Sequence, residues 1–248
     1  MAFKIIICII AGIGAGLGTG FAGMSAAAVI SPMLITFLDM DSYLAVGIAL
    51  ASDVLASAVS AYTYGKNKNL DIKNGLIMMA SVLCFTLVGS YVASIVPKTT
   101  MGNFSVFMTL LLGIKFIVKP VVAPKARLQN ATAKQKAVRS VICGFIGAGG
   151  GMMMLLVLTT VLGYELKTAV GTSVFIMAAT ALTGSVSHFV IGGAPDLTAL
   201  ITCVASTLVF ALIAALIANK VSAKTLNRAT GAVLVVLGAA IIIVNRIK

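Results

Sequence analysis

The sequence predicts an all-α integral membrane protein built from two homologous halves, and three observations predict it. Hydrophobic residues make up 60% of the 248 residues and charged residues only 10%, against roughly 25% charged residues in an ordinary soluble domain. The apolar runs are too long and too continuous for the strands of a membrane barrel, so they predict helices. One unit of sequence also occurs twice.

The repeat is visible in two anchors that have the same spacing in both halves. Gly20-Phe21-Ala22-Gly23 returns as Gly144-Phe145-Ile146-Gly147, and Ala45-Val46-Gly47 returns as Ala169-Val170-Gly171. The stretch between the anchors aligns without a gap. In a strongly apolar chain, this pattern is typical of a membrane transporter whose two halves surround a shared site.

The polar stretches between the apolar runs divide the chain into three parts. We expect a first transmembrane repeat over 1–118, a basic cytoplasmic linker over 119–139 and a second transmembrane repeat over 140–248. Asp71 and Asp196 each stand before an apolar run, where a side-chain oxygen caps free amides at a helix start. The predicted helices, about 8–10 membrane segments in all, cover roughly 3–38, 43–64, 73–96, 101–118, 140–162, 168–190, 197–219 and 226–245.

The first run of each half is predicted to break within the membrane. A single helix over 3–38 would be about 54 Å long, against a hydrocarbon core of about 30 Å. Because glycine weakens a helix and lets other backbone approach, we expect breaks within 16–23 and 144–151. Each half then has five helical pieces, with a broken or re-entrant first helix. Small-residue helix packing explains the same glycines without a break, and both explanations can hold together.

The number of crossings decides how the two halves are related. An odd number per half places the repeats upside down relative to each other, whereas an even number leaves them parallel. Basic residues concentrate in cytoplasmic loops, but the two arrangements satisfy this rule about equally, and both place 115–139 in the cytoplasm. The length of the first segments favours the inverted arrangement.

The remaining composition argues against several kinds of partner. The formal net charge is +12, but the basic residues are scattered over loops without a soluble basic domain or an aromatic platform, so nucleic acid is not expected. The four cysteines lie in apolar runs at wide spacings and are interpreted as core residues, and no metal or other cofactor is expected. Since no soluble domain follows the first apolar run, a signal peptide is the less favoured interpretation of that run.

These motifs resemble those of the TauE/SafE family of sulfite exporters, also called the toluene-sulfonate uptake permease group, over nearly the whole chain. The strongest match is the glycine run 144–151, with Gly-Thr-Ser downstream at 171–173. The first half departs from the pattern at 23–27 and 47–49, although it keeps Ser31-Pro32. The resemblance implies a multi-pass carrier of small sulfur-containing anions, such as sulfite, sulfonates or thiosulfate, in the cytoplasmic membrane.

The scarcity of deep positive charge predicts how an anion would be bound. No lysine or arginine lies deeper in a predicted span than Lys115, so backbone amides and hydroxyls must replace the hydration shell. A half-helix that restarts near the midplane supplies free N–H groups and a positive dipole end. The same residues could instead only pack helices. The candidate substrate contacts are Gly20, Gly23, Met24, Ser25, Ala26, Ser52, Gly147, Gly149, Gly150, Gly151, Thr172 and Ser173.

Asp53 falls near the middle of a predicted span, where a carboxylate is costly and is by default a functional residue. One interpretation makes it the coupling residue for a proton or another cation. The other makes it a carboxyl group satisfied by neighbouring serines such as Ser52 and Ser57. The repeat aligns Asp53 with Met177, so coupling of this kind would belong to the first half alone.

Other functions are weighed against an anion transporter. A membrane-embedded enzyme needs acidic, basic or nucleophile–base clusters at membrane depth, and Asp53 has no glutamate or arginine near it in the sequence, so no catalytic residues are expected. A passive anion channel or a structural subunit of a membrane complex remains as the alternative. His188 is interpreted as a polar aromatic residue at the membrane interface, in preference to a proton relay. Membrane lipids are expected partners, and homo-oligomerisation, the substrate and the direction of transport stay open.

Overall fold

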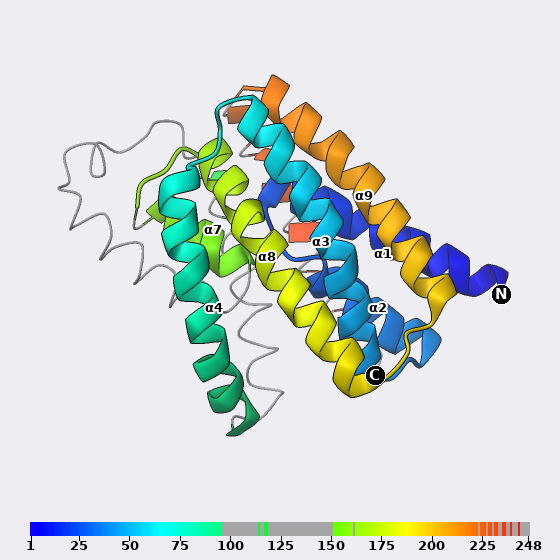
Figure 1. Ribbon diagram of the computed structural model, residues 1–248. Coiled ribbons are helices and arrows are strands. Elements are labelled where there is room, and N and C mark those ends of the chain that lie inside the picture. The colour runs from blue at the N-terminus through cyan, green and yellow to red at the C-terminus, as the bar shows by residue number, and fades with distance from the viewer. Residues whose placement is uncertain are drawn as a thin grey trace.

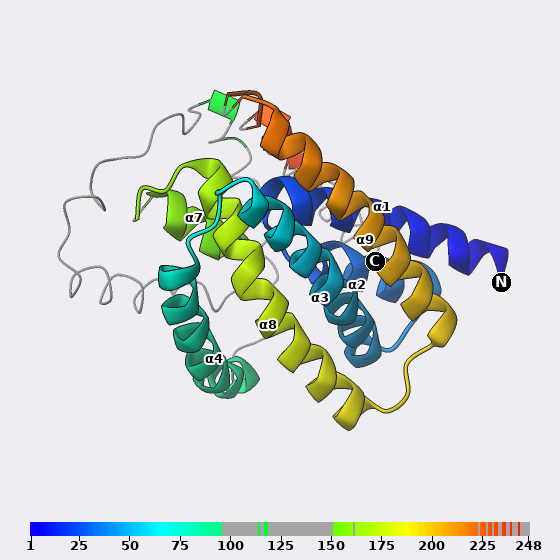
Figure 2. The same ribbon diagram turned by 45° about the horizontal axis from the view of Figure 1, so that its top comes forward.

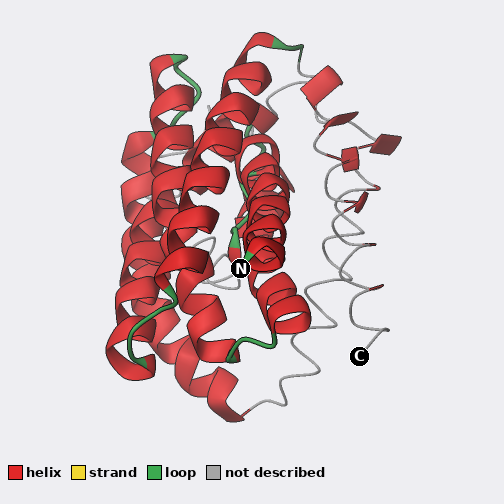
Figure 3. Ribbon diagram, turned by 90° about the vertical axis from the view of Figure 1, so that its right-hand side faces the viewer, coloured by secondary structure: helices red, strands yellow, loops and turns green. Residues whose placement is uncertain are grey.

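The computed structural model describes residues 1–95, 151–160 and 162–222, with short runs and single positions among residues 114–118 and 224–243. Within these parts every regular element is a helix (Figure 3). The all-α prediction is confirmed there, and the linker 119–139 lies wholly outside the described residues. The helices are α1 (Ala2–Ala22), α2 (Ala27–Leu38), α3 (Ser42–Lys66), α4 (Ile72–Ile95), α7 (Gly151–Thr160), α8 (Leu166–Gly192) and α9 (Leu197–Lys220).

The described residues contain four helices that are long and apolar enough to cross a membrane. They cover Ala2–Ala22, Tyr43–Lys66, Leu166–Val190 and Leu197–Lys220. The 12-residue α2 rises about 18 Å, which is too short to span a hydrocarbon core of about 30 Å alone. The further segments expected from the sequence depend on residues beyond the described ones.

Carboxylates directly before three helices cap their first turns. The side chain of Asp71 accepts a hydrogen bond from the N–H of Asn74 at 3.1 Å, and that of Asp196 from the N–H of Ala199 at 3.0 Å. Asp41 does the same for α3. Amides at a helix start have no partner within the helix, so these bonds fix where α3, α4 and α9 begin. The caps predicted at Asp71 and Asp196 are confirmed.

Helices α3 and α8, which the repeat makes equivalent, run antiparallel at the centre of the described bundle (Figure 1). A Cβ added to Gly47, near the start of α3, would lie 2.9 Å from the ring of Phe189, near the end of α8. One added to Gly171, near the start of α8, would lie 2.8 Å from the Cβ of Tyr64, near the end of α3. Glycines at both ends therefore let the two helices approach closely.

The other long helices flank this central pair. Helix α9 packs beside α3, α1 lies along α9, and α4 packs beside α8, as Figures 1 and 2 show from two directions. Under the repeat, α9 corresponds to α4. The contact of α3 with α9 is thus matched by the contact of α8 with α4, as a duplicated scaffold requires.

Three glycines of α1 form its contact with α9. A Cβ on Gly12 would lie 1.8 Å from the Ser206 Oγ, one on Gly16 would lie 2.6 Å from the carbonyl oxygen of Thr207, and one on Gly20 would lie 2.4 Å from the Cβ of Ala214. Such approaches are possible only without side chains, so this face is a small-residue packing interface.

Within the stretch 16–23, where a break was expected, the helix is interrupted only at the last residue. Helix α1 continues to Ala22, and Gly23 ends it in a left-handed conformation with φ 60°, its N–H bonded to the Thr19 carbonyl at 2.9 Å. A residue other than glycine is strained at that φ. The corresponding residues 144–150 lie outside the described part, so the pair of breaks stays a prediction.

The two ends of the bundle carry opposite charge in the described residues. Asn69, after α3, bonds to Asn219 at the end of α9, and Lys167 of α8 bonds to the carbonyl oxygens of Asn219 and Val221. The lysines Lys66, Lys68, Lys73, Lys167 and Lys220 lie at this end and outnumber Asp71 and Glu165 there, and we call it the lysine-rich end. The acidic residues Asp39, Asp41 and Asp196 lie at the opposite end and outnumber Lys4.

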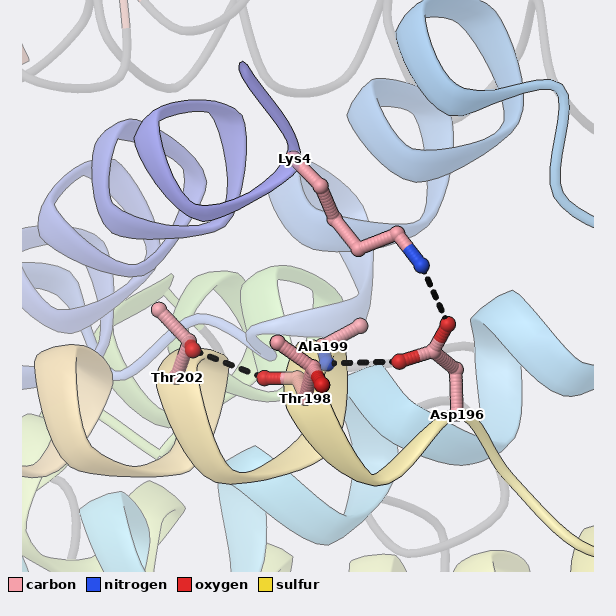
Figure 4. Close-up of polar contacts among 5 residues, drawn as sticks. All are labelled: Lys4, Asp196, Thr198, Ala199 and Thr202. Carbon is pink, nitrogen blue, oxygen red and sulfur yellow. Dashed lines mark hydrogen bonds and ion pairs between the residues drawn. The ribbon is translucent and has the colours of Figure 1, made fainter. Parts of the chain in front are cut away.

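An ion pair at the acidic end ties the start of α1 to the start of α9 (Figure 4). The Lys4 Nζ lies 2.5 Å from the Asp196 Oδ2, while the other carboxylate oxygen accepts from the N–H of Ala199. Lys4 donating to this carboxylate holds the pKa of Asp196 below its usual range, and the Ala199 amide acts in the same direction. Both side chains are about a third exposed, so solvent weakens the pair.

Candidate functional site

The interruption between α1 and α2, residues 23–26, is held by hydroxyl groups from two helices. The Thr19 Oγ1, in the last turn of α1, donates to the carbonyl of Met24 at 2.9 Å. The Ser173 Oγ, in α8, donates to the carbonyl of Gly23 at 3.0 Å. A serine of the second half of the sequence thus fixes the backbone of the first.

Ser25 connects this interruption to α3. Its Oγ accepts a hydrogen bond from the N–H of Ala27 at 3.3 Å, which caps the start of α2. The same Oγ donates to the Oδ2 of Asp53 at 2.7 Å. Met24 and Ala26 on either side are fully buried, whereas Ser25 is partly exposed.

Asp53 is buried to 1% exposure, and both of its carboxylate oxygens have donors. Ser25 donates to Oδ2, and the Oγ of Ser57, one turn along α3, donates to Oδ1 at 2.8 Å. Among the buried side chains of the described residues, Asp53 alone is charged. The predicted contribution of Ser57 is confirmed, but that of Ser52 is wrong, because the Ser52 hydroxyl donates instead to the carbonyl of Ile48 at 2.9 Å.

The carboxyl group of Asp53 lies at the N-terminal end of α2, one hydrogen bond away from the amide that Ser25 caps. The free N–H groups and the positive end of the helix dipole at such a terminus stabilise negative charge. This is the end at which the sequence predicted an anion from solution. In this conformation, the carboxyl group of the chain itself occupies the position.

The structure does not place all of the other predicted substrate contacts at the interruption 23–26. The carbonyl of Gly20 accepts from the buried Tyr64 hydroxyl at 2.8 Å. Packing against α9 explains the absence of a side chain at Gly20, and this bond explains its carbonyl, so no role in substrate binding is needed. Thr172 is fully buried next to Ser173 but accepts from the N–H of Asp71 at 3.2 Å, away from the interruption. Gly151 is the first residue of α7. The predicted contacts at Gly147, Gly149 and Gly150 lie outside the described residues.

Sequence reasoning missed the polar cluster near the lysine-rich end. The Tyr164 hydroxyl donates to the Asp71 carboxylate at 2.7 Å, and the Asn74 side chain donates to the same oxygen at 2.6 Å. Asp71 was predicted only as a helix cap. Asn74 lies in the first turn of α4, whereas Asp71 and Tyr164 lie in separate loops, and no local pattern in the sequence signals that Tyr164 reaches Asp71.

His188 lies where the end of α8 meets the start of α3. Its Nδ1 is 3.0 Å from the carbonyl oxygen of Tyr43, and the two rings stack with centroids 4.1 Å apart. The interface position predicted for His188 agrees with this placement at a helix end, well separated along α3 from Asp53.

An apolar groove of about 700 Å³ lies between α3, α4 and α8. Its lining includes Ala58, Tyr62 and Phe175, with Lys66 among them, but none of the predicted contacts. In the parts of the chain that the structure describes, no three histidine, cysteine, aspartate or glutamate side chains come together as metal ligands would.

Comparisons with known proteins agree with this architecture. Residues 8–241 match the family model described as sulfite exporter TauE/SafE. The chain is similar to the probable membrane transporter protein YunE of Bacillus subtilis (strain 168), with 26% identity over 198 residues, 71% of this chain and 72% of that protein. It is also similar to the probable membrane transporter protein YdhB of the same organism, with 21% identity over 185 residues, 71% of this chain and 76% of that protein.

Proposed function

Because the chain belongs to the TauE/SafE sulfite exporter family of multi-pass membrane transporters, we propose that it carries a small sulfur-containing anion across the cytoplasmic membrane. The substrate class comprises sulfite, sulfonates and thiosulfate. The observation that supports this most directly is the α2 terminus at 23–26, where the hydroxyl of Ser25, with that of Ser57 from α3, already holds one carboxyl group in a buried setting.

The substrate binds between the two glycine-rich stretches. In the first half, the amides of Ser25 and Ala26 donate to substrate oxygens, while those of Gly23 and Met24 bond to carbonyl oxygens of α1 and join the site only when those bonds open. In the second half, Gly147, Gly149, Gly150 and Gly151 provide the equivalent amides, and Ser173, which already reaches Gly23, adds a hydroxyl; Thr172 adds one only when its bond to Asp71 opens. Amides and hydroxyls hold an anion less firmly than a lysine would, which suits a carrier that has to release what it binds.

Asp53 couples the anion to a proton. Two negative charges cannot share one helix end in a low-dielectric site without a large repulsion. A substrate anion therefore binds at the α2 terminus when Asp53 is protonated, and an ionised Asp53 replaces the substrate when the carrier is empty. The position of Met177 in the repeat means that only the first half carries this group.

The energetics of transport fit such a coupling. With a negative cytoplasm, each exported negative charge gains about 2.3 kcal/mol per 100 mV, so export needs no coupling ion. Uptake of the same anion requires a co-transported cation, and the proton on Asp53 supplies it. The proton on Asp53 is therefore needed only for uptake, including uptake of the anion from a low external concentration.

The charge distribution supports one orientation. The lysine-rich end faces the cytoplasm under the positive-inside rule, and the acidic end, with the start of α1, faces outward. The antiparallel course of α3 and α8 supports an inverted repeat. In that arrangement, each half presents the same surfaces to opposite sides of the membrane.

The test is flux into and out of reconstituted proteoliposomes with a panel of sulfite, thiosulfate, sulfoacetate and non-sulfur anions. We expect saturable transport of the sulfur anions and loss of it in Gly150→Leu, which fills the second glycine stretch. Unsaturable flux would identify a channel. Normal transport by Gly150→Leu would contradict the binding site, and transport of the non-sulfur anions alone would contradict the substrate class.

A further inference from the structure

Helix α3 carries a buried polar stripe that leads from Asp53 toward the lysine-rich end. Asp53, Ser57, Ser60 and Tyr64 follow one another at spacings of four, three and four residues, which places them on one face of a helix. Their exposed fractions are 1%, 0%, 0% and 0%. Tyr64 is the last residue of the stripe, and its hydroxyl donates to the carbonyl of Gly20 near the end of α1.

Ser60 is the unusual member of this stripe. Its Oγ is fully buried and has no hydrogen-bond partner. Other hydroxyls on α3 behave differently, since Ser52 and Thr63 donate to the carbonyls one turn back at 2.9 and 2.8 Å. Leaving a buried hydroxyl unpaired costs about 1–3 kcal/mol. A group kept at that cost calls for an explanation such as a water molecule or an ion in another state.

The repeat shows that the hydroxyls accompany the carboxyl group. In α8, the positions equivalent to Asp53, Ser57 and Ser60 are Met177, Ala181 and Gly184. Helix α8, which lacks the carboxylate, therefore also lacks the two serine hydroxyls of the stripe. The stripe of hydroxyls beside a carboxylate is thus a property of α3 and not of α8.

We propose that Ser57 and Ser60 form the path by which a proton reaches Asp53 from the lysine-rich end. This inference rests on the coupling role proposed above for Asp53. A proton arriving at Ser60 through water binds the hydroxyl oxygen, and that hydroxyl releases its own proton toward Ser57. Ser57, which already donates to the Oδ1 of Asp53, passes a proton to the carboxylate in the same way. Each serine ends with the one proton it began with, and the carboxylate gains one.

The path is closed in this conformation. Ser60 and Tyr64 are both fully buried, so bulk water does not reach the stripe. Opening requires the end of α1 to move away from Tyr64, which breaks the bond to Gly20. Access of protons from the lysine-rich end is thereby linked to the position of α1, as alternating access requires.

The test follows protonation of Asp53 itself and needs no substrate. Purified protein in lipid membranes is subjected to a pH jump, and the infrared band of the protonated carboxyl group is recorded over time. Asp53→Asn identifies the band by abolishing it. We expect Ser60→Ala to slow the appearance of the band by about ten-fold or more, while Ser60→Thr, which keeps a hydroxyl, stays close to the wild-type rate.

Thr63→Val is the matched control, because it removes a buried hydroxyl from the same helix but off the stripe. Its rate should equal that of the wild type. A wild-type rate in Ser60→Ala, with or without a gain in thermal stability, would overturn the path and leave Ser60 as a packing defect. Absence of any Asp53 band in the wild type would overturn the coupling role instead. A normal band and normal rates in a protein that transports none of the sulfur anions would contradict the transport proposal alone.

Discussion

The Oγ of Ser25, in the interruption between α1 and α2, donates to the Oδ2 of Asp53, in the middle of α3, at 2.7 Å. This bond joins the end at which an anion is expected to the only charged group among the buried side chains that the structure describes. Substrate binding and the charge of Asp53 thus depend on the same few atoms. Four predictions follow from this site and from the helices that hold it.

Replacing Asp53 by asparagine should separate anion movement from proton movement. The amide has nearly the shape of the carboxyl group but takes up no proton, so Asp53→Asn should still export the anion down the membrane potential. It should lose proton-coupled uptake. Anion flux and internal pH, recorded together in proteoliposomes, check this. Asp41→Asn is the control, since asparagine caps a helix as well as aspartate does; unchanged proton movement in Asp53→Asn would rule out the coupling role.

Alanine at Gly23 should impair transport through the backbone. At φ 60° a residue with a Cβ costs about 1–2 kcal/mol, and the added Cβ would lie 3.3 Å from Ser173. The carbonyl that Ser173 binds would then be displaced, so we expect a raised KM for the anion. Gly193→Ala provides the comparison, because Gly193 has φ 87° but nothing within 4 Å. Equal effects of the two variants on KM would mean that strain alone is responsible.

The contact between α1 and α9 should respond differently at two neighbouring glycines. In Gly12→Ala, the new Cβ meets the side chain of Ser206, at 1.8 Å from Oγ, so a second change, Ser206→Gly, should restore most of the lost stability. In Gly16→Ala, the nearest atoms are backbone atoms of α9, and no substitution there removes them. Each single variant should lose about 1–3 kcal/mol, measured by thermal unfolding in detergent.

If Ser206→Gly restored the stability of Gly16→Ala, or failed to restore the stability of Gly12→Ala, then α1 and α9 would not pack in this register. Either result would also mean that packing against α9 does not explain Gly20, which would again be expected to contact the substrate. The comparison therefore tests the position of the break as well as the interface.

The ion pair between Lys4 and Asp196 should stabilise the fold only above acidic pH. Because Lys4 lowers the pKa of Asp196 in the folded protein, the stabilisation is complete above the unfolded value of about 3.9 and disappears as pH falls through the folded value. Asp196→Asn keeps the cap on α9 but not the charge. At neutral pH it should cost at most about 1 kcal/mol, since the pair is partly exposed.

The measurement is the difference in unfolding midpoint between the wild type and Asp196→Asn across a pH series. That difference should vanish in acid and shrink in high salt. A difference that persists at the lowest pH would mean that the hydrogen bonds of Asp196, and not its charge, hold the start of α9.

The apolar composition was sufficient to predict an all-α membrane protein, the capping residues predicted the helix starts at Asp71 and Asp196, and the resemblance of the glycine motifs to a known family predicted the family. These predictions rest on local features of the sequence, namely apolar runs, capping residues and spaced motifs. The site was predicted only in pieces. Ser25 and Asp53 were each proposed for a separate role, because nothing in the order of residues along a chain shows that a turn after α1 returns to the middle of α3.

The glycines illustrate the same limit. Gly12, Gly16 and Gly20 follow the spacing of a helix-packing face, whereas only Gly23 adopts a left-handed φ. Both roles draw on the same property, the absence of a side chain, so a run of glycines does not indicate where a helix ends. Helix α1 ends at the one of these glycines that lies against α8, Gly23, while the other three pack against α9.

The hydrogen bond from Ser173 to the Gly23 carbonyl has a consequence for how this gene could change. The repeat aligns Ser173 with Ala49, so a chain assembled from two copies of its own first half would present a methyl group to that carbonyl and leave it unpaired. Two second halves would lack the aspartate. The two halves are therefore not interchangeable, because each supplies a group that the aligned position of the other lacks, and we expect neither to serve alone as a homodimer.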